Sequence, residues 1–452
     1  MKILVFNGSP KGANSVTLQT VRYLAKKFPE DVFEAIHVGQ RIKVFEKDMS
    51  GMAEKIAEAD IILFSYPVYT FIAPSQLHRF IELLKENNIS LEGKFVTQIT
   101  TSKHFYDVTA HKYIEENVYD LKGKFIKGLS ADMEDLLNKK GQDEAVSFWK
   151  YVMFCVENDI YENAPQPYAP HNNIYKASTY DQNHAKIYDV VIVADYGEQD
   201  ENLKNMIADF RNIFPYETRV VNIREYPFIG GCLGCFGCAS DGKCIYVDGF
   251  DTFLREKIQT ADSIIYAFNV KDHSMGARFK MYDDRQFCNG HRTVTMGMPI
   301  GYIISGDYSK ENNLKTIVEA RADVGHTPLT HVATDEGDTL RELEKLSAKL
   351  AFALENKLEM PQTFYGVGGM KIFRDLIYIM RGLMKADHQF YKEKGIYDFP
   401  QKQKGKMIAM QLVGAMANNP KLQKKMKGKM TEGMLMPYNK VIEKEEKKNK
   451  KK

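Results

Sequence analysis

Short, fully apolar segments alternate along most of the chain with longer segments of helical periodicity. The segment KILVF (Lys2–Phe6) is followed by the polar loop NGSPKGANS and then by VTLQTVRYLAKKF, whose apolar residues have helical spacing. Two further apolar segments follow, ADIILFSYPVY (Ala59–Tyr69) and GKFVTQITTS (Gly93–Ser102). Apolar strands that alternate with helices are typical of a parallel sheet covered on both faces. The pattern therefore predicts an α/β fold with a doubly wound sheet.

The same order of segments occurs a second time from Tyr188. The segment ADSIIYAFNVKD (Ala261–Asp272) corresponds to ADIILFSYPVY, and MPIGYIISGDYS (Met298–Ser309) corresponds to the third apolar segment. The second and third strands are separated by 34 residues in the first copy and 36 in the second, whereas the first and second strands are separated by 58 and 74. The sequence thus predicts a tandem duplication with about 16 extra residues in the second copy. Two unrelated α/β domains are the alternative.

Four segments follow from this pattern. We assign residues 1–161 to a first doubly wound domain, 162–185 to a linker rich in proline and asparagine, and 186–358 to a second doubly wound domain. Residues 359–452 have apolar side chains at helical spacing and many lysines, and they end in EKEEKKNKKK. They are interpreted as a helical, basic C-terminal extension.

Composition and charge narrow the class of protein. Apolar residues make up 44% of the chain and charged residues 27%, as in ordinary globular proteins, and no apolar segment approaches the length of a membrane span. The first residues do not resemble a signal peptide, so we expect a cytoplasmic protein. Residues 401–452 contain 15 lysines and 4 glutamates but no regular interleaving of aromatic residues. We expect this tail to be solvated and not to bind nucleic acid, with contact to a membrane surface as the alternative.

The loop after the first strand has the residues of an anion site. A helix N-terminus offers unpaired backbone N–H groups to a phosphate, and the hydroxyls and charge of this loop add to them. The candidate residues are Ser9, Lys11, Asn14, Ser15 and Thr17. Alone, this is a weak signal, because strand-to-helix turns also use Gly and Ser for the turn and the helix cap.

Two more loops are expected at the same edge of the sheet. Ligands of doubly wound proteins bind beyond the carboxyl ends of the strands. Pro67, Val68 and Tyr69 end the second strand and offer a rigid turn with an aromatic face, although a buried proline turn would look the same. Residues 100–102 end the third strand and would form a third wall of the site; a polar capping loop is the alternative. These residues are Thr100, Thr101 and Ser102.

Together, GSPKGANSVT and the later PVY resemble the NADPH-dependent FMN reductase family, whose fold is flavodoxin-like. The resemblance implies FMN as the cofactor and NAD(P)H as its electron donor. It places Ser9, Lys11, Asn14, Ser15 and Thr17 at the FMN phosphate. It places Pro67, Val68 and Tyr69 at the isoalloxazine ring.

The segment GGCLGCFGCASDGKC holds four of the six cysteines, Cys232, Cys235, Cys238 and Cys244. Three thiols at intervals of three with a fourth close by suit a [4Fe–4S] cluster, whereas structural zinc sites divide their thiols into two separated pairs. The five residues before the last cysteine differ from the ferredoxin pattern. The segment instead resembles that of the iron-sulfur flavoproteins, a branch of the same family. A zinc site and a redox-active thiol loop remain alternatives.

The second copy lacks the signals for a flavin. Its first loop, ADYGEQDEN, carries acidic residues that would repel a phosphate, and its second-strand loop has neither proline nor tyrosine. We therefore expect FMN in the first copy and the cluster in the second, brought together by pairing of the copies as an intrachain pseudo-dimer; a homo-oligomer is also possible.

The sequence thus indicates an NAD(P)H-dependent oxidoreductase that passes electrons through FMN and the cluster to a small-molecule or protein acceptor. The alternative is an electron carrier without a substrate of its own, and a zinc-stabilised flavin-binding module is a third possibility.

Overall fold

The computed structural model describes residues 1–162, 164, 174–178, 184–226 and 228–417. Most of the expected linker and the end of the C-terminal extension lie outside the described residues. The first domain contains one parallel sheet in the order β2-β1-β3-β4-β5, and β6 also pairs with β4. Its elements are β1 (Lys2–Asn7), α1 (Val16–Lys27), β2 (Val32–Ile36), α2 (Ile42–Phe45), α3 (Met52–Glu58), β3 (Ile61–Pro67), α4 (Ser75–Glu86), β4 (Phe95–Ser102), α5 (Asp107–Asp120), β5 (Lys124–Phe125), β6 (Leu129–Asp132) and α6 (Lys139–Glu157).

The second domain repeats this arrangement. Its parallel sheet has the order β11-β10-β9-β7-β8, which is the strand order of the first sheet and of flavodoxin-like folds. Its elements are β7 (Ala185–Ala194), α7 (Glu201–Ile213), β8 (Tyr216–Asn222), α8 (Gly237–Asp241), α9 (Phe250–Phe253), β9 (Ser263–Asn269), α10 (Gly276–Arg285), β10 (Ile300–Ser305), α11 (Asn312–Gly325), β11 (Leu329–Thr334) and α12 (Thr339–Asn356). Both domains therefore have a doubly wound, flavodoxin-like α/β fold, as the sequence predicts.

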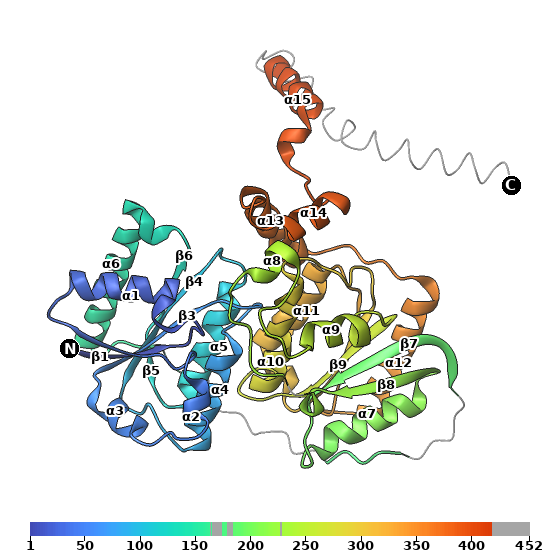
Figure 1. Ribbon diagram of the computed structural model, residues 1–452, viewed down its shortest axis with the longest axis horizontal. Coiled ribbons are helices and arrows are strands. Elements are labelled where there is room, and N and C mark those ends of the chain that lie inside the picture. Colours follow the sequence, from blue (N-terminus) through green and yellow to red (C-terminus); the bar gives the residue numbers. More distant parts are fainter. Residues whose placement is uncertain (163, 165–173, 179–183, 227, 418–452) are drawn as a thin grey trace. The chain divides into compact units, whose positions relative to one another are not determined.

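Alternating side chains of the central strands explain why both faces of the first sheet are covered. Ile3 and Val5 of β1 belong to the core beneath α1 and α6, whereas Leu4 and Phe6 belong to the core on the opposite face. All four are almost fully buried. A strand that is buried on both faces has no polar side, which is why it appears in the sequence as a continuous apolar segment. Figure 1 shows α1 and α6 on the same side of this sheet.

The loop after β3 and the loop after β9 have the same conformation at positions 202 residues apart. Tyr69 and Ile72 form a backbone bridge, and so do Lys271 and Ser274. The two residues within each turn have positive φ angles in both copies, Thr70 and Phe71 in the first and Asp272 and His273 in the second. The connection from β8 to β9 (223–262) is 16 residues longer than that from β2 to β3 (37–60), and it contains the cysteines. The duplication and its insertion thus agree with the sequence pattern.

The two domains contact each other through equivalent helices, α4 against α10 and α5 against α11. The helix N-termini are capped reciprocally. Oδ2 of Asp284 accepts a hydrogen bond from the backbone N–H of Ser75 at the start of α4 (2.8 Å). Oε1 of Glu82 accepts one from the N–H of Ala277 at the start of α10 (2.7 Å). Each helix therefore stabilises the positive end of its counterpart.

The C-terminal extension contains α13 (Phe364–Ile379), α14 (Lys385–Glu393) and α15 (Lys404–Ala417). The residues up to Phe390 belong to one unit with the two sheets, and a second unit begins at Tyr391. In the second unit, the large apolar side chains of α15 are exposed; they are Met407, Ile408, Met410 and Leu412. The helices of the described part of the chain are all too short or too polar to cross a membrane.

Candidate functional site

The loop between β1 and α1 presents buried hydroxyl groups at a helix N-terminus. Ser15 is the N-cap of α1, and its Oγ accepts a hydrogen bond from the N–H of Leu18 (3.4 Å). Ser9 is buried, and its Oγ accepts from the N–H of Lys11 (3.3 Å). Thr17 is buried as well, yet its Oγ1 has no hydrogen-bond partner among the described residues. Asn14, in contrast, is exposed.

These groups fit the phosphate end of FMN. A buried hydroxyl without a partner is unfavourable, so an unpaired Thr17 at a helix N-terminus points to a bound acceptor. The backbone is also shaped for a close approach. Gly12 has a φ of +54°, and a Cβ atom there would lie 2.0 Å from the Gln40 side chain. A Cβ atom at Gly39 would lie 2.2 Å from the carbonyl oxygen of Gly8, so neither glycine is replaceable without a shift of the loop.

The loop after β3 is the second wall of the site. Pro67 ends β3, the N–H of Val68 donates to the carbonyl of Thr101 (3.3 Å), and Tyr69 starts the tight turn. The third wall follows β4, where the two neighbouring threonines have different roles. Thr101 has a buried hydroxyl without a described partner, whereas the hydroxyl of Thr100 lies 2.7 Å from Nε2 of His111. Neither threonine lines the cavity described next, to which this strand contributes Ser102.

One cavity of about 150 Å³ lies between the loop after β3, Pro67–Phe71 (the ring loop), and the cysteine loop, Gly230–Cys244. Val68 and Tyr69 line it from the first domain together with Ser102, and all four loop cysteines line it from the second. The two loops touch, because a Cβ atom at Gly234 would lie 1.9 Å from the Tyr69 hydroxyl. Burial and the neighbouring thiols raise the pKa of Tyr69 well above its usual value, so its phenol remains protonated.

Three arginines hold the backbone of the cysteine loop. Arg285 is buried, makes a bidentate ion pair with Asp248 (2.8 Å for both contacts), and donates to the carbonyl of Gly230 (3.0 Å). Arg292 donates to the carbonyl of Cys238 (3.4 Å), and Arg255 donates to the carbonyl of Gly242. Each arginine is also paired with a carboxylate, that of Asp248, Asp387 or Asp251, so ion pairs fix the backbone of the loop.

The thiols of this loop are spread widely and are buried to different degrees. Burial raises the pKa of Cys232 to about 12 and that of Cys238 to about 11, so metal binding must release protons. Cys235 is exposed. The four cysteines do not form a group whose sulfur atoms all lie within 4.8 Å of one another. A single zinc ion with Zn–S bonds of about 2.3 Å would require sulfur atoms roughly 3.8 Å apart.

Several residues of this cavity were not predicted from the sequence. Cys288 is buried and is a fifth cysteine of the lining, although its sequence surroundings suggest a plain core thiol. The others come from separate elements; they are Phe105, Met133, Phe236, His291 and Phe373. Phe236 also lies under Nζ of Lys11, which is 5.7 Å from the ring centroid, so the cysteine loop reaches the phosphate loop as well.

The corresponding first loop of the second domain is occupied by its own ion pairs. Asp195 is buried and accepts a hydrogen bond from Nε of Arg224 (2.5 Å). Asp200 accepts from the N–H of Gly197 (2.6 Å). A carboxylate thus lies where the first domain offers free hydroxyls, in agreement with the acidic sequence of this loop.

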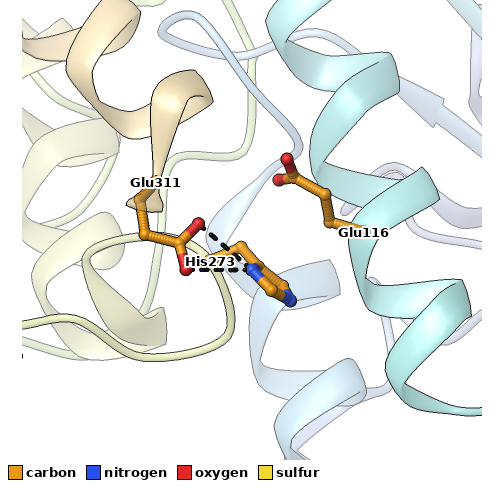
Figure 2. Close-up of side chains that lie close together, drawn as sticks. All are labelled: Glu116, His273 and Glu311. Atoms are coloured by element: carbon orange, nitrogen blue, oxygen red, sulfur yellow. Dashed lines mark hydrogen bonds and ion pairs between the residues drawn. The ribbon is translucent and has the colours of Figure 1, made fainter. Parts of the chain in front are cut away.

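Glu116, His273 and Glu311 lie between the two domains with donor atoms within 4.8 Å of one another (Figure 2). Nδ1 of His273 is 3.1 Å from both carboxylate oxygens of Glu311, and its Nε2 is 3.1 Å from Asp120. Burial lowers the pKa of His273, but these hydrogen bonds raise it overall to about 10. The imidazole is therefore a cation at neutral pH, and it pairs with the carboxylates of Glu311 and Asp120. The cluster is an ion-pair contact between the domains.

Comparison with known proteins finds similarity in the first domain and along part of the chain. Residues 1–122 match the family model described as NADPH-dependent FMN reductase. The chain is similar to an iron-sulfur flavoprotein of Archaeoglobus fulgidus, with 28% identity over 211 residues that cover 44% of this chain and 94% of that protein.

Two of the solved structures that match the chain do so over about a third of its length. One is general stress protein 14 of Treponema denticola in complex with FMN, with 12% identity, coverage of 34% of this chain and 99% of that chain, and a TM-score of 0.28. The other is an FMN-dependent NADH-azoreductase of Bacillus anthracis in complex with FMN, with 16% identity, coverage of 35% and 99%, and a TM-score of 0.28.

The first domain is thus similar to NADPH-dependent FMN reductases over residues 1–122. The fold of both domains is flavodoxin-like, and their common strand order is consistent with a tandem duplication.

Proposed function

We propose that the protein passes electrons from NAD(P)H through FMN in the first domain and a [4Fe–4S] cluster in the second to a small-molecule or protein acceptor. The observation that carries the proposal is the shared cavity, which is lined both by the Val68–Tyr69 loop and by the four loop cysteines. Two redox groups held at one cavity are close enough to exchange electrons directly.

The chain's own residues suit these two groups. Ser9, Lys11, Ser15 and Thr17 would hold the FMN phosphate, and Pro67, Val68 and Tyr69 would flank the ring. Cys232, Cys235, Cys238 and Cys244 would bind the cluster. FMN accepts two electrons as a hydride and can release them one at a time, which is the chemistry that joins NAD(P)H to a one-electron centre.

The cluster is favoured over zinc by the donor set and by its spacing. Thiolates around a four-iron body stand further apart than those around one ion, and the loop sulfur atoms are not gathered closely. The similarity to an iron-sulfur flavoprotein is consistent with this choice.

Anaerobic purification tests the proposal. We expect about one FMN and about four iron atoms with four sulfides per chain, and bleaching of the flavin spectrum by NADH or NADPH. A purified protein that contains zinc instead of iron would contradict the proposed [4Fe–4S] cluster. A protein that contains both groups but is not reduced by either nucleotide would be an electron carrier and not an NAD(P)H oxidoreductase.

A further inference from the structure

Helix α10 of the second domain holds the ring loop of the first domain through a buried ion pair. Lys280 has no exposed surface, and its Nζ donates to the backbone carbonyl of Tyr69 (3.0 Å) and to Oδ1 of Asp284 (2.5 Å). Asp284 is also fully buried. The same Oδ1 accepts a hydrogen bond from the hydroxyl of Thr70 (3.3 Å), and Oδ2 caps α4 at the N–H of Ser75.

The loop that this pair holds is strained. Thr70 and Phe71 have φ angles of 45° and 75°, which are unfavourable for residues with a Cβ atom. Such a conformation persists only where its surroundings fix it. Lys280 and Asp284 contact Tyr69, Thr70 and Ser75, so they bind both sides of the strained turn.

A buried lysine is present on only one side of the pseudo-symmetric contact. The residue 202 positions before Asp284 is Glu82, which caps α10 in the same way. The residue 202 positions before Lys280 is His78. Burial, and after it the charge of Lys280, lowers the pKa of His78 well below its usual value, so this imidazole is neutral. The cation in the equivalent turn of the second domain is His273, which pairs with Glu311 and Asp120 instead. The buried lysine–aspartate pair is therefore specific to the loop beside the cysteines.

The surrounding charges balance. Lys280 also lies 3.5 Å from Asp283, which is paired in turn with Arg321 of α11. Two cations and two anions therefore form a buried group beside the ring loop, with no net charge. Removal of one member leaves an uncompensated charge next to the site.

We propose that Lys280 and Asp284 are positioning residues for the flavin of the first domain, and that their balanced charges set its midpoint potential. This inference rests on the proposed function, because it places the FMN ring against Pro67–Tyr69. Reduction adds negative charge to a flavin, so a nearby uncompensated cation favours the reduced form and an uncompensated anion disfavours it.

The test uses the full-length holoprotein with Lys280→Met and Asp284→Asn. Both variants loosen the turn, so FMN affinity should fall at least about tenfold in each. The flavin potential should move in opposite directions, down in Lys280→Met and up in Asp284→Asn. A tenfold change in the ratio of affinities for reduced and oxidised flavin corresponds to about 30 mV for a two-electron couple. Glu82→Gln removes the negative charge of the equivalent cap on α10, while its amide oxygen can still accept from Ala277, and should change neither quantity.

The double variant Lys280→Met/Asp284→Asn leaves no uncompensated charge from this pair, so it covers the case in which a single variant does not fold. It should bind FMN more weakly than wild type but with the wild-type potential. Equal shifts of the same sign in both single variants, or a changed potential in the double variant, would overturn the inference and leave the proposed function intact. A wild-type protein that binds no flavin would overturn both.

Discussion

Two threonine hydroxyls are buried in the elements that flank the candidate flavin site, that of Thr17 in the first turn of α1 and that of Thr101 near the carboxyl end of β4. Neither has a hydrogen-bond partner among the described residues. Burial of an unpaired hydroxyl costs about 1–3 kcal/mol, so the protein is destabilised at these positions unless a ligand supplies the acceptor. The same deficit makes each threonine a sensitive probe of binding.

Thr17→Val should lower FMN affinity about tenfold, since a hydrogen bond to a charged group contributes about 1.5–3 kcal/mol. The free energy of unfolding without ligand should not fall, because valine removes an unsatisfied group of similar size. Titration with FMN and with riboflavin distinguishes the cause, because riboflavin lacks the phosphate and should bind equally to both proteins. Thr20→Val, one turn further along α1, is the matched control. Equal losses for both ligands would contradict the assignment.

Individual site residues were predictable only where the chemistry lies within one loop. Ser9, Ser15 and Thr17 belong to one strand-to-helix turn, so their association follows from the sequence. That Ser102 lines the cavity and Thr100 and Thr101 do not could not be predicted in this way, because the sequence does not say how far along the strand the cavity reaches. Phe373 lies on α13, far along the chain, and no local pattern connects it with the cavity.

At the scale of elements, the cysteine loop is held by groups outside itself. Arg285 and Arg292 bind its carbonyls, and Asp387 of α14 accepts hydrogen bonds from His291 and Arg292. A Cβ atom at Gly290 would lie only 2.3 Å from the Asp387 carboxylate, so this carboxylate packs directly against the glycine. The extension therefore supports the wall of the cavity, which the sequence alone did not suggest.

Cys235→Ala should reduce iron well below four atoms per chain while FMN stays bound and reducible, because the first domain is unchanged. Reduction of a one-electron acceptor such as a viologen dye or a cytochrome should slow. Cys288→Ala is the matched control, since this thiol lines the same cavity but lies outside the loop motif. Iron content, flavin content and acceptor reduction are measured for both. If Cys288→Ala loses the iron and Cys235→Ala keeps it, the assignment of ligands is wrong.

Central strands were predictable and edge strands were not. The residues of β1, β3, β9 and β10 are almost all buried, so these strands appear as apolar segments. β2, β8 and β11 lie at or near the sheet edges with mostly half-exposed side chains, and Val32 is 62% exposed. Their mixed composition resembles that of loops, which is why the sequence pattern passes over them.

At the scale of the whole molecule, the contact between the domains depends on pH. The pKa of His273 is about 10 against an ordinary value near 6.5, so its stabilising effect is complete below pH 6.5 and is lost as the pH rises towards 10. Burial raises the pKa of Glu116 to about 7, and its ionisation weakens the contact as the pH rises from about 4.5 to 7. Both groups act in the same direction.

The free energy of unfolding should therefore fall between pH 7 and pH 10, and part of this fall should vanish in His273→Gln. Denaturant titrations at pH 7, 8, 9 and 10 measure the difference between the two proteins, which should be largest at pH 7 and smallest at pH 10. His104→Gln is the control, because this histidine pairs with Asp107 within the first domain. A difference that does not change with pH would show that His273 acts by packing and not by charge.

The two halves should also differ in flavin content. In the second domain, the carboxylate of Asp195 occupies the loop that corresponds to the candidate phosphate loop and already pairs with Arg224. Flavin released by heat should therefore amount to about one FMN per chain. Absorbance after denaturation measures this ratio against protein concentration. A ratio near two would show that the acidic loop does bind a flavin.

Reciprocal capping by Asp284 and Glu82 takes place within a single polypeptide. A pair of separate subunits with the same contacts would dissociate on dilution, whereas two halves joined by a linker meet at an effective concentration in the millimolar range. Association of the two halves is thus intramolecular, and it does not depend on the protein concentration. The subunits of a symmetric homodimer have the same sequence, whereas the two halves of one chain can differ. The first half retains the unpaired hydroxyl of Thr17 beside its first helix, and the second half carries the thiols.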